Sequence, residues 1–154
     1  GMTESSGSVW SESLPYLVSV DSPENGENVP NFEAEVTVSP EEFCSVILSE
    51  YPDAVFPEDT SEWITGAEYS GSGRLASVRI GGVTVPGTAL RSLFSLRSTA
   101  IRFDLSGGAV AFITEGSGHG VGMSQYGANI LALGGEKYAD ILAHYYPGTE
   151  LVFE

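Results

Sequence analysis

The clearest hydrophobic pattern is an alternation of apolar and acidic side chains over residues 32–38. A period of two is typical of a strand with one buried face, so the pattern predicts a half-buried β-strand here. Ser39 and Pro40 follow directly and suit the cap and the first turn of a helix. We expect this helix to end near Tyr51, because Pro52 disfavours helical geometry in the residue before it.

Glycine-containing turns predict two β-hairpins in the middle of the chain. Gly81-Gly82 would form the first turn and Ser106-Gly107-Gly108 the second, each between short apolar runs. A short helix is expected between the hairpins, capped by Thr88 and reaching residue 96. The predicted hairpin strands are residues 75–80 with 83–85, and residues 101–105 with 109–114.

Two more helices are expected in the last third of the chain. They cover residues 124–133 and 136–145, and Gly134-Gly135 and Pro147-Gly148 would end them. Residues 151–153 form a candidate last edge strand.

The remaining stretches are irregular, and the whole pattern indicates a fold class. Residues 1–31 are rich in Ser, Glu, Pro and Gly but hold an apolar cluster, so we expect an irregular arm that packs on the body. Residues 52–66 are expected to form an acidic loop. The order of elements predicts an α+β fold with a mainly antiparallel sheet, built from hairpins, and three to four short helices. A length of 154 residues fits one domain.

The charge is strongly negative and unevenly spread. The formal net charge is −15, and residues 1–68 contain 15 of the 21 acidic side chains but no Lys or Arg. Nucleic-acid binding depends largely on Lys and Arg, so we exclude a nucleic-acid partner. No apolar run is long enough to span a membrane, and no signal-peptide pattern opens the chain. The polar beginning at Gly1-Met2 suggests an excised segment.

Candidate chemistry is concentrated in residues 116–127. Glycine occupies every second position from 116 to 122, which lets the backbone approach a neighbour closely and leaves His119 on the other face. A helix is expected to follow, and the first amides of a helix can bind an oxygen-rich ligand. The run lacks the spacing of a dinucleotide fingerprint, the Lys of a P-loop and the pattern of a hydrolase elbow.

The residues alone leave two interpretations of this cluster open. His119, Ser124, Gln125 and Tyr126 could serve a substrate, or they could form a strand-to-helix corner in which Ser124 caps the helix and His119 is bonded internally. His144 is interpreted as an imidazole at a helix C-terminus. No His or Cys spacing supports a metal site, and Cys44 is expected to act as a small hydrophobe.

Several motifs resemble the sporulation stage II protein D (SpoIID/LytB) family, in the C-terminal portion of its catalytic domain. The most specific is Gly118-His119-Gly120-Val121-Gly122-Met123-Ser124-Gln125-Tyr126-Gly127-Ala128, which is similar to the family signature. Further similarity lies at Leu96-Arg97-Ser98-Thr99, Tyr138-Ala139-Asp140-Ile141-Leu142 and His144-Tyr145-Tyr146-Pro147-Gly148-Thr149. Val9-Trp10 and Leu14-Pro15-Tyr16-Leu17 also resemble a family segment.

The resemblance implies lytic transglycosylase action on peptidoglycan. In that reaction a Glu protonates the glycosidic oxygen between N-acetylmuramic acid and N-acetylglucosamine, and the muramoyl 6-hydroxyl closes on the anomeric carbon. The substrate-binding candidates are His119, Ser124, Gln125, Tyr126 and Arg97. The implied location is extracytoplasmic, in the cell envelope. A membrane anchor would lie in a segment that precedes this chain. The implied partners are glycan strands and other cell-wall hydrolases.

The chain departs from the family in having no match to the catalytic Glu. That residue, and the zinc ligands of some members, would lie upstream, so we expect no cofactor in this chain. Glu115 lies nearest the cluster in sequence but matches no family acid. We therefore expect the wall of a substrate groove without the proton donor, and an inactive chain in isolation. The alternative is a non-catalytic glycan-binding or amidase-enhancing module.

Overall fold

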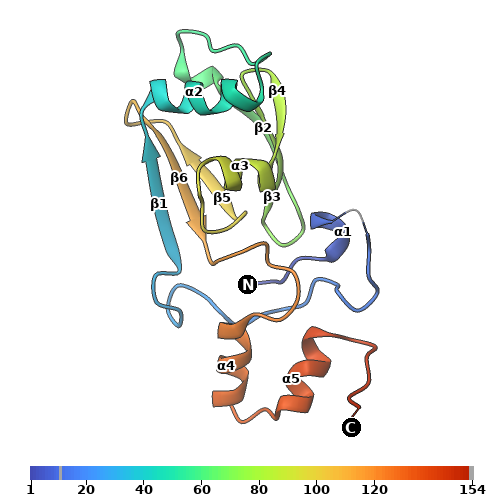
Figure 1. Cartoon of the computed structure of the whole chain (residues 1–154). Coiled ribbons are helices and arrows are strands. Elements are labelled where there is room, and N and C mark those ends of the chain that lie inside the picture. Colours follow the sequence, from blue (N-terminus) through green and yellow to red (C-terminus); the bar gives the residue numbers. More distant parts are fainter. Residues whose placement is uncertain (11, 153–154) are drawn as a thin grey trace. The chain divides into compact units, whose positions relative to one another are not determined.

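The computed structural model describes residues 1–10 and 12–152 (Figure 1). The chain divides into two compact units. The central unit comprises Glu33–Gly118, and the terminal unit combines Gly1–Phe32 with His119–Glu154. The interpretation of the whole chain as one domain with an irregular arm stays a prediction.

The central unit contains two antiparallel three-stranded sheets, which confirms the predicted α+β class (Figure 1). Both predicted hairpins form, one in each sheet, and the strand predicted from the alternation at residues 32–38 pairs with the second hairpin. The first sheet has the order β1 (Glu33–Val38), β6 (Val110–Glu115), β5 (Ile101–Asp104). The second has the order β2 (Ile64–Tyr69), β3 (Leu75–Ile80), β4 (Val83–Pro86).

Strand β2 corrects the prediction that residues 52–66 form one loop. Most of its side chains are exposed, and its register with β3 shifts between Thr65 and Glu68. A strand that contributes backbone hydrogen bonds but little buried apolar surface leaves no alternation in the sequence. The 3-10 helix η1 (Thr60–Glu62) precedes it, capped by the carboxylate of Asp59, which accepts from the Ser61 amide at 2.9 Å.

The helices of the central unit match their predictions in place but not at every end. Helix α2 (Pro40–Glu50) begins as predicted, and the Ser39 hydroxyl accepts from the Glu42 amide at 3.2 Å. Helix α3 (Gly87–Leu93) is not capped by Thr88, because Pro86 occupies the cap position and the helix starts at Gly87. Gly87 lies so close to the backbone carbonyl of Leu75 that a Cβ there would overlap it.

An apolar core fills the central unit. Phe43 on α2 is fully buried and stacks between Trp63 and Phe94, with ring centroids 6.0 and 5.5 Å away. Burial raises the pKa of the neighbouring Cys44 thiol, and Glu41 adds to the effect. A thiol held protonated suits the predicted packing role better than that of a nucleophile.

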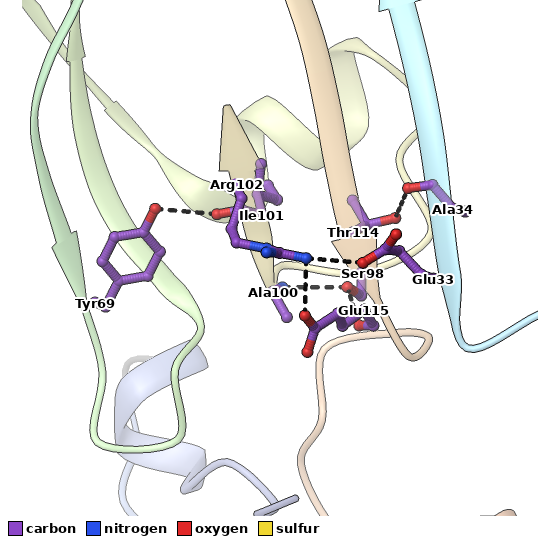
Figure 2. Close-up of polar contacts among 9 residues, drawn as sticks. All are labelled: Glu33, Ala34, Tyr69, Ser98, Ala100, Ile101, Arg102, Thr114 and Glu115. Carbon is purple, nitrogen blue, oxygen red and sulfur yellow. Dashed lines mark hydrogen bonds and ion pairs between the residues drawn. The ribbon is translucent and has the colours of Figure 1, made fainter. Parts of the chain in front are cut away.

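Polar contacts connect the strands at one edge of this unit (Figure 2). Arg102 on β5 forms ion pairs with Glu33 on β1 at 2.8 Å and with Glu115 on β6 at 3.1 Å. Tyr69 on β2 donates its hydroxyl to the carbonyl of Ile101 at 3.1 Å, which connects the two sheets. About half of each ion-paired side chain is exposed, so these pairs contribute little to stability.

The terminal unit contains the one-turn helix α1 (Ser6–Val9) and helices α4 (Gln125–Leu133) and α5 (Tyr138–Tyr145), of which α4 and α5 pack on each other (Figure 1). Helix α4 confirms its prediction, and α5 begins two residues later than expected. Leu151 and Val152 are not in a strand, and residue 153 of the candidate edge strand lies outside the described residues.

Polar contacts, more than apolar packing, stabilise the terminal unit. Within its described residues the buried hydrophobic side chains are Val29, Ile141 and Tyr145, whereas the apolar core cluster lies in the central unit. The arm pairs with itself at Met2 and Asp21, and the amino group of Gly1 donates to the Ser22 carbonyl at 2.7 Å. Among the helices of residues 1–10 and 12–152, none is long and apolar enough to cross a membrane.

Candidate functional site

The glycine segment, residues 116–122, has the backbone geometry that its sequence predicts. Gly116, Gly118, Gly120 and Gly122 have φ angles of +67°, +74°, +81° and +80°. L-residues with a side chain rarely adopt such angles, because Cβ then lies too close to the carbonyl oxygen. The alternating glycines therefore give a path that few other residues could follow.

The first part of the glycine segment belongs to the central unit. Its Gly118 amide donates to the Arg97 carbonyl at 2.7 Å, and Ser98 forms a parallel bridge with Gly118. The guanidinium of Arg97 donates to the Ser117 hydroxyl at 3.2 Å. Arg97, a predicted substrate contact, is exposed and lies beside this first part.

The second part of the segment belongs to the terminal unit, where the arm holds it. The Glu4 amide donates to the Gly120 carbonyl at 2.9 Å, and Glu4 forms a parallel bridge with Val121. From the other side, the Tyr146 hydroxyl accepts from the Met123 amide at 3.3 Å. Backbone contacts thus position the segment.

His119 is exposed, and its ring contacts Val121 and Trp10. Its Nδ1 accepts a hydrogen bond from the Val121 amide at 3.0 Å, so in the neutral ring the proton resides on Nε2. The ring lies 5.3 Å from that of Trp10, at an interplanar angle of 57°. The hydrogen bond from Val121 fits the structural interpretation of His119, and the exposure of the residue fits a substrate contact.

Ser124, Gln125 and Tyr126 differ in their contacts and in their exposure to solvent. The Ser124 hydroxyl caps α4 by accepting from the Gly127 amide at 3.1 Å, as the structural interpretation predicted for that residue. Gln125 and Tyr126 occupy the first turn of α4 and are exposed, Tyr126 over 52% of its surface. His119, Gln125 and Tyr126 thus present their polar side chains to solvent, while Ser124 has a structural task.

The residues at the end of α5 form hydrogen bonds with the arm and next to the glycine segment. The Nε2 of His144 lies 2.6 Å from the carbonyl oxygen of Asp21, and the Tyr145 hydroxyl lies 2.6 Å from that of Ser22. Burial raises the pKa of the Tyr145 hydroxyl; the hydrogen bond with Ser22 opposes this effect, and the nearby Glu24 adds to it. His144 therefore contacts the arm in addition to lying at the helix C-terminus. Tyr145 and Tyr146 have a structural role.

Sequence reasoning missed two features of the arm. Glu4 is a carboxylic residue with only 4% of its surface exposed, and its Oε1 accepts from the Ser5 amide at 3.0 Å. Trp10 is brought against His119 although 109 positions separate them in the chain. In the sequence, the one signal for Trp10 was its place beside an apolar cluster. The sequence contains no signal for Glu4.

The predicted absence of a metal site stays a prediction. Over residues 1–10 and 12–152, no group of three or more His, Cys, Asp or Glu side chains is arranged to hold a metal ion.

Comparisons with known proteins show which family carries these motifs. No family model matches the sequence. Stage II sporulation protein D of Bacillus amyloliquefaciens is 36% identical over 151 residues, which cover 98% of this chain and 42% of that protein. The corresponding protein of Bacillus subtilis (strain 168) is 34% identical over 151 residues, with the same coverage. Over the region it spans, the chain resembles stage II sporulation protein D along almost all of its length.

The stage II sporulation protein D relatives are longer than this chain, which spans less than half of their length. A third similarity is to the amidase enhancer of Bacillus subtilis (strain 168), 36% identical over 85 residues, or 53% of this chain and 12% of that protein. The match to both proteins agrees with the resemblance drawn from the glycine segment and the motif at residues 144–149.

Proposed function

We propose that this chain is part of a peptidoglycan lytic transglycosylase that cleaves between N-acetylmuramic acid and N-acetylglucosamine. The names of the relatives, a sporulation protein and an amidase enhancer, support a role related to the cell wall. A substrate in the wall would require the protein to act in the cell envelope, outside the cytoplasm, near other wall hydrolases. Within this proposal the chain supplies substrate contacts and not the catalytic acid.

The observation that carries the proposal is the exposure of polar side chains along a backbone of unusual shape. His119, Gln125 and Tyr126 lie on or directly after the glycine segment, and all three are exposed. Imidazole, amide and phenol groups both donate and accept hydrogen bonds, which suits the hydroxyl and acetamido groups of a glycan.

Neither Glu115 nor Glu4 is a good candidate for the proton donor. Glu115 forms an ion pair with Arg102 at the sheet edge, and Glu4 is buried with Oε1 bonded to the Ser5 amide. A general acid must reach the glycosidic oxygen directly or through one water. We therefore expect the isolated chain to bind glycan without cleaving it.

The second candidate function is a non-catalytic glycan-binding or amidase-enhancing module. The similarity to the amidase enhancer over 85 residues favours it. Both candidates require the exposed cluster to bind glycan, and they differ in whether a Glu upstream acts with it.

Binding and cleavage are tested on the chain as it stands. The chain is incubated with purified peptidoglycan, the bound fraction is measured by sedimentation, and the products are examined by mass spectrometry for 1,6-anhydro-muramoyl ends. We expect binding without such ends. Robust release of anhydro ends would contradict the assignment of the acid to another segment, and absence of binding would contradict both candidate functions.

Substitution of the cluster then separates substrate contacts from structural ones. Replacing His119, Gln125 or Tyr126 with Ala should each weaken sedimentation with peptidoglycan while changing stability by less than ~0.5 kcal/mol. Asn129→Ala, at another exposed position of α4, is the matched control and should bind like the unchanged chain. Unchanged binding in all three variants would refute the role of the cluster.

A further inference from the structure

The two tryptophans of this chain occupy very different surroundings. Trp63 has 7% of its surface exposed, stacks on Phe43, and donates its indole N–H to the Pro57 carbonyl at 2.7 Å. Trp10 has 46% of its surface exposed. Within residues 1–10 and 12–152, its indole N–H has no hydrogen-bond partner. Trp63 is thus a core residue, and Trp10 is a surface residue whose exposed aromatic ring requires another explanation.

Trp10 is held in place although it is exposed. Its amide closes α1 by donating to the Ser6 carbonyl at 2.7 Å. Ser6 is fully buried; its amide donates to the Leu17 carbonyl at 2.9 Å, and its hydroxyl accepts from the Leu14 amide at 2.8 Å. This polar anchor fixes the one-turn helix and therefore the direction in which Trp10 leaves the arm.

The same arm fixes His119, so the two rings have a defined relationship. Glu4, two residues before Ser6, donates to the Gly120 carbonyl, and Val121 in turn donates to His119 Nδ1. The Trp10 and His119 rings consequently meet at 5.3 Å with a tilt of 57°. One short stretch of arm thus positions an exposed indole beside the imidazole of the candidate site.

We propose that Trp10 is a sugar-stacking residue of this site, and that a pyranose ring of the glycan lies on its indole with His119 beside it. This inference rests on the proposed function, because it places a ring of that substrate. One face of a pyranose carries mainly C–H groups, which pack on an aromatic face and cover apolar surface on both sides. The indole N–H then supplies a donor for a hydroxyl or acetamido oxygen at the rim of the sugar.

The structural alternative is that the Trp10–His119 contact only holds the arm to the glycine segment. The backbone hydrogen bond from Glu4 to Gly120 and the bridge between Glu4 and Val121 already make that attachment. An aromatic pair serving packing alone would also be buried, as Phe43 and Trp63 are in the central unit. The exposure of both Trp10 and His119 therefore favours a ligand as the missing partner of the indole face.

The test uses the full chain labelled with 5-fluorotryptophan, which gives one fluorine resonance for each of Trp10 and Trp63. The ligand is a soluble tetrasaccharide of alternating N-acetylglucosamine and N-acetylmuramic acid. We expect the Trp10 resonance to shift on titration while that of Trp63 stays in place. Trp10→Ala should raise the dissociation constant, measured by calorimetry, by about 10-fold, and Trp10→Phe should raise it by less.

Controls separate a binding role from a folding role. Tyr138→Ala removes another exposed aromatic of the terminal unit and should leave the dissociation constant unchanged. Trp10→Ala should keep its melting temperature within about 3 °C of the unchanged chain, because the side chain is half exposed. Binding that is unchanged in Trp10→Ala would overturn this inference and leave the proposed function standing. A chain that does not bind the tetrasaccharide or peptidoglycan at all would overturn both.

Discussion

Gly127→Ala should destabilise the terminal unit, although helix propensity alone predicts the opposite. Gly127 lies in the first turns of α4, and Ala in a helix is normally more favourable than Gly by ~1 kcal/mol. The first two turns of α4 are well ordered by the Ser124 cap, so the propensity gain should apply there. Packing around Gly127 decides the sign.

A Cβ on Gly127 would overlap three polar atoms at once. These are the Tyr145 hydroxyl, the Ser22 hydroxyl and a carboxylate oxygen of Glu24. The three groups form a connected network, in which the Ser22 hydroxyl donates to Glu24 and lies 2.6 Å from the Tyr145 hydroxyl. Ser22 and Tyr145 are almost completely buried, so neither can move aside into solvent.

The expected change in the free energy of unfolding is the balance of opposing contributions. Overpacking of a filled site costs ~1–3 kcal/mol, and separating a buried hydrogen-bonded pair costs a further ~1–3 kcal/mol. Helix propensity returns only ~1 kcal/mol. We therefore expect the free energy of unfolding of the terminal unit to fall by about 1–5 kcal/mol.

Urea denaturation of the chain labelled with 5-fluorotryptophan measures this effect unit by unit. Trp10 reports on the terminal unit and Trp63 on the central unit. Ala132→Gly, at an exposed position of the same helix, is the control and should cost up to ~1 kcal/mol through propensity alone. A Gly127→Ala chain as stable as the unchanged one, or more stable, would refute the reasoning from packing.

Two further predictions concern the backbone of the glycine segment and the pH dependence of stability. Gly120→Val should lower the free energy of unfolding, measured by urea denaturation, by at least ~1 kcal/mol, because a β-branched residue is strained at a φ of +81°. Gly107→Val, at an open position without a positive φ, should lower it by less, and equal losses would contradict this explanation. Burial raises the pKa of Tyr145 in the folded chain, so its contribution is complete below the unfolded value of about 10 and is lost as the pH rises through the folded pKa. Thermal melts should therefore show a steeper loss of stability above pH ~10 in the unchanged chain than in Tyr145→Phe, and parallel profiles would count against this assignment.

The sequence by itself determined the features that depend on neighbouring residues. The alternation before Ser39, the Ser39 and Ser124 caps and the Gly81-Gly82 hairpin all formed as predicted, because each depends on contacts within a few positions. The left-handed glycine segment belongs to the same class, since only glycine adopts such angles readily. The resemblance through this segment also agrees with the similarity to stage II sporulation protein D.

Only the tertiary structure decided which distant residues share a site. Strand β2 depends on pairing with β3, and its exposed side chains leave no periodic trace in the sequence. The pair of Ser22 with Tyr145 and that of Trp10 with His119 join segments more than 100 residues apart. Local pattern cannot specify such pairs, because they depend on how the arm folds back along the C-terminal segment and not on the spacing of its residues. The burial of Glu4 and the exposure of Trp10 follow from that same path of the arm.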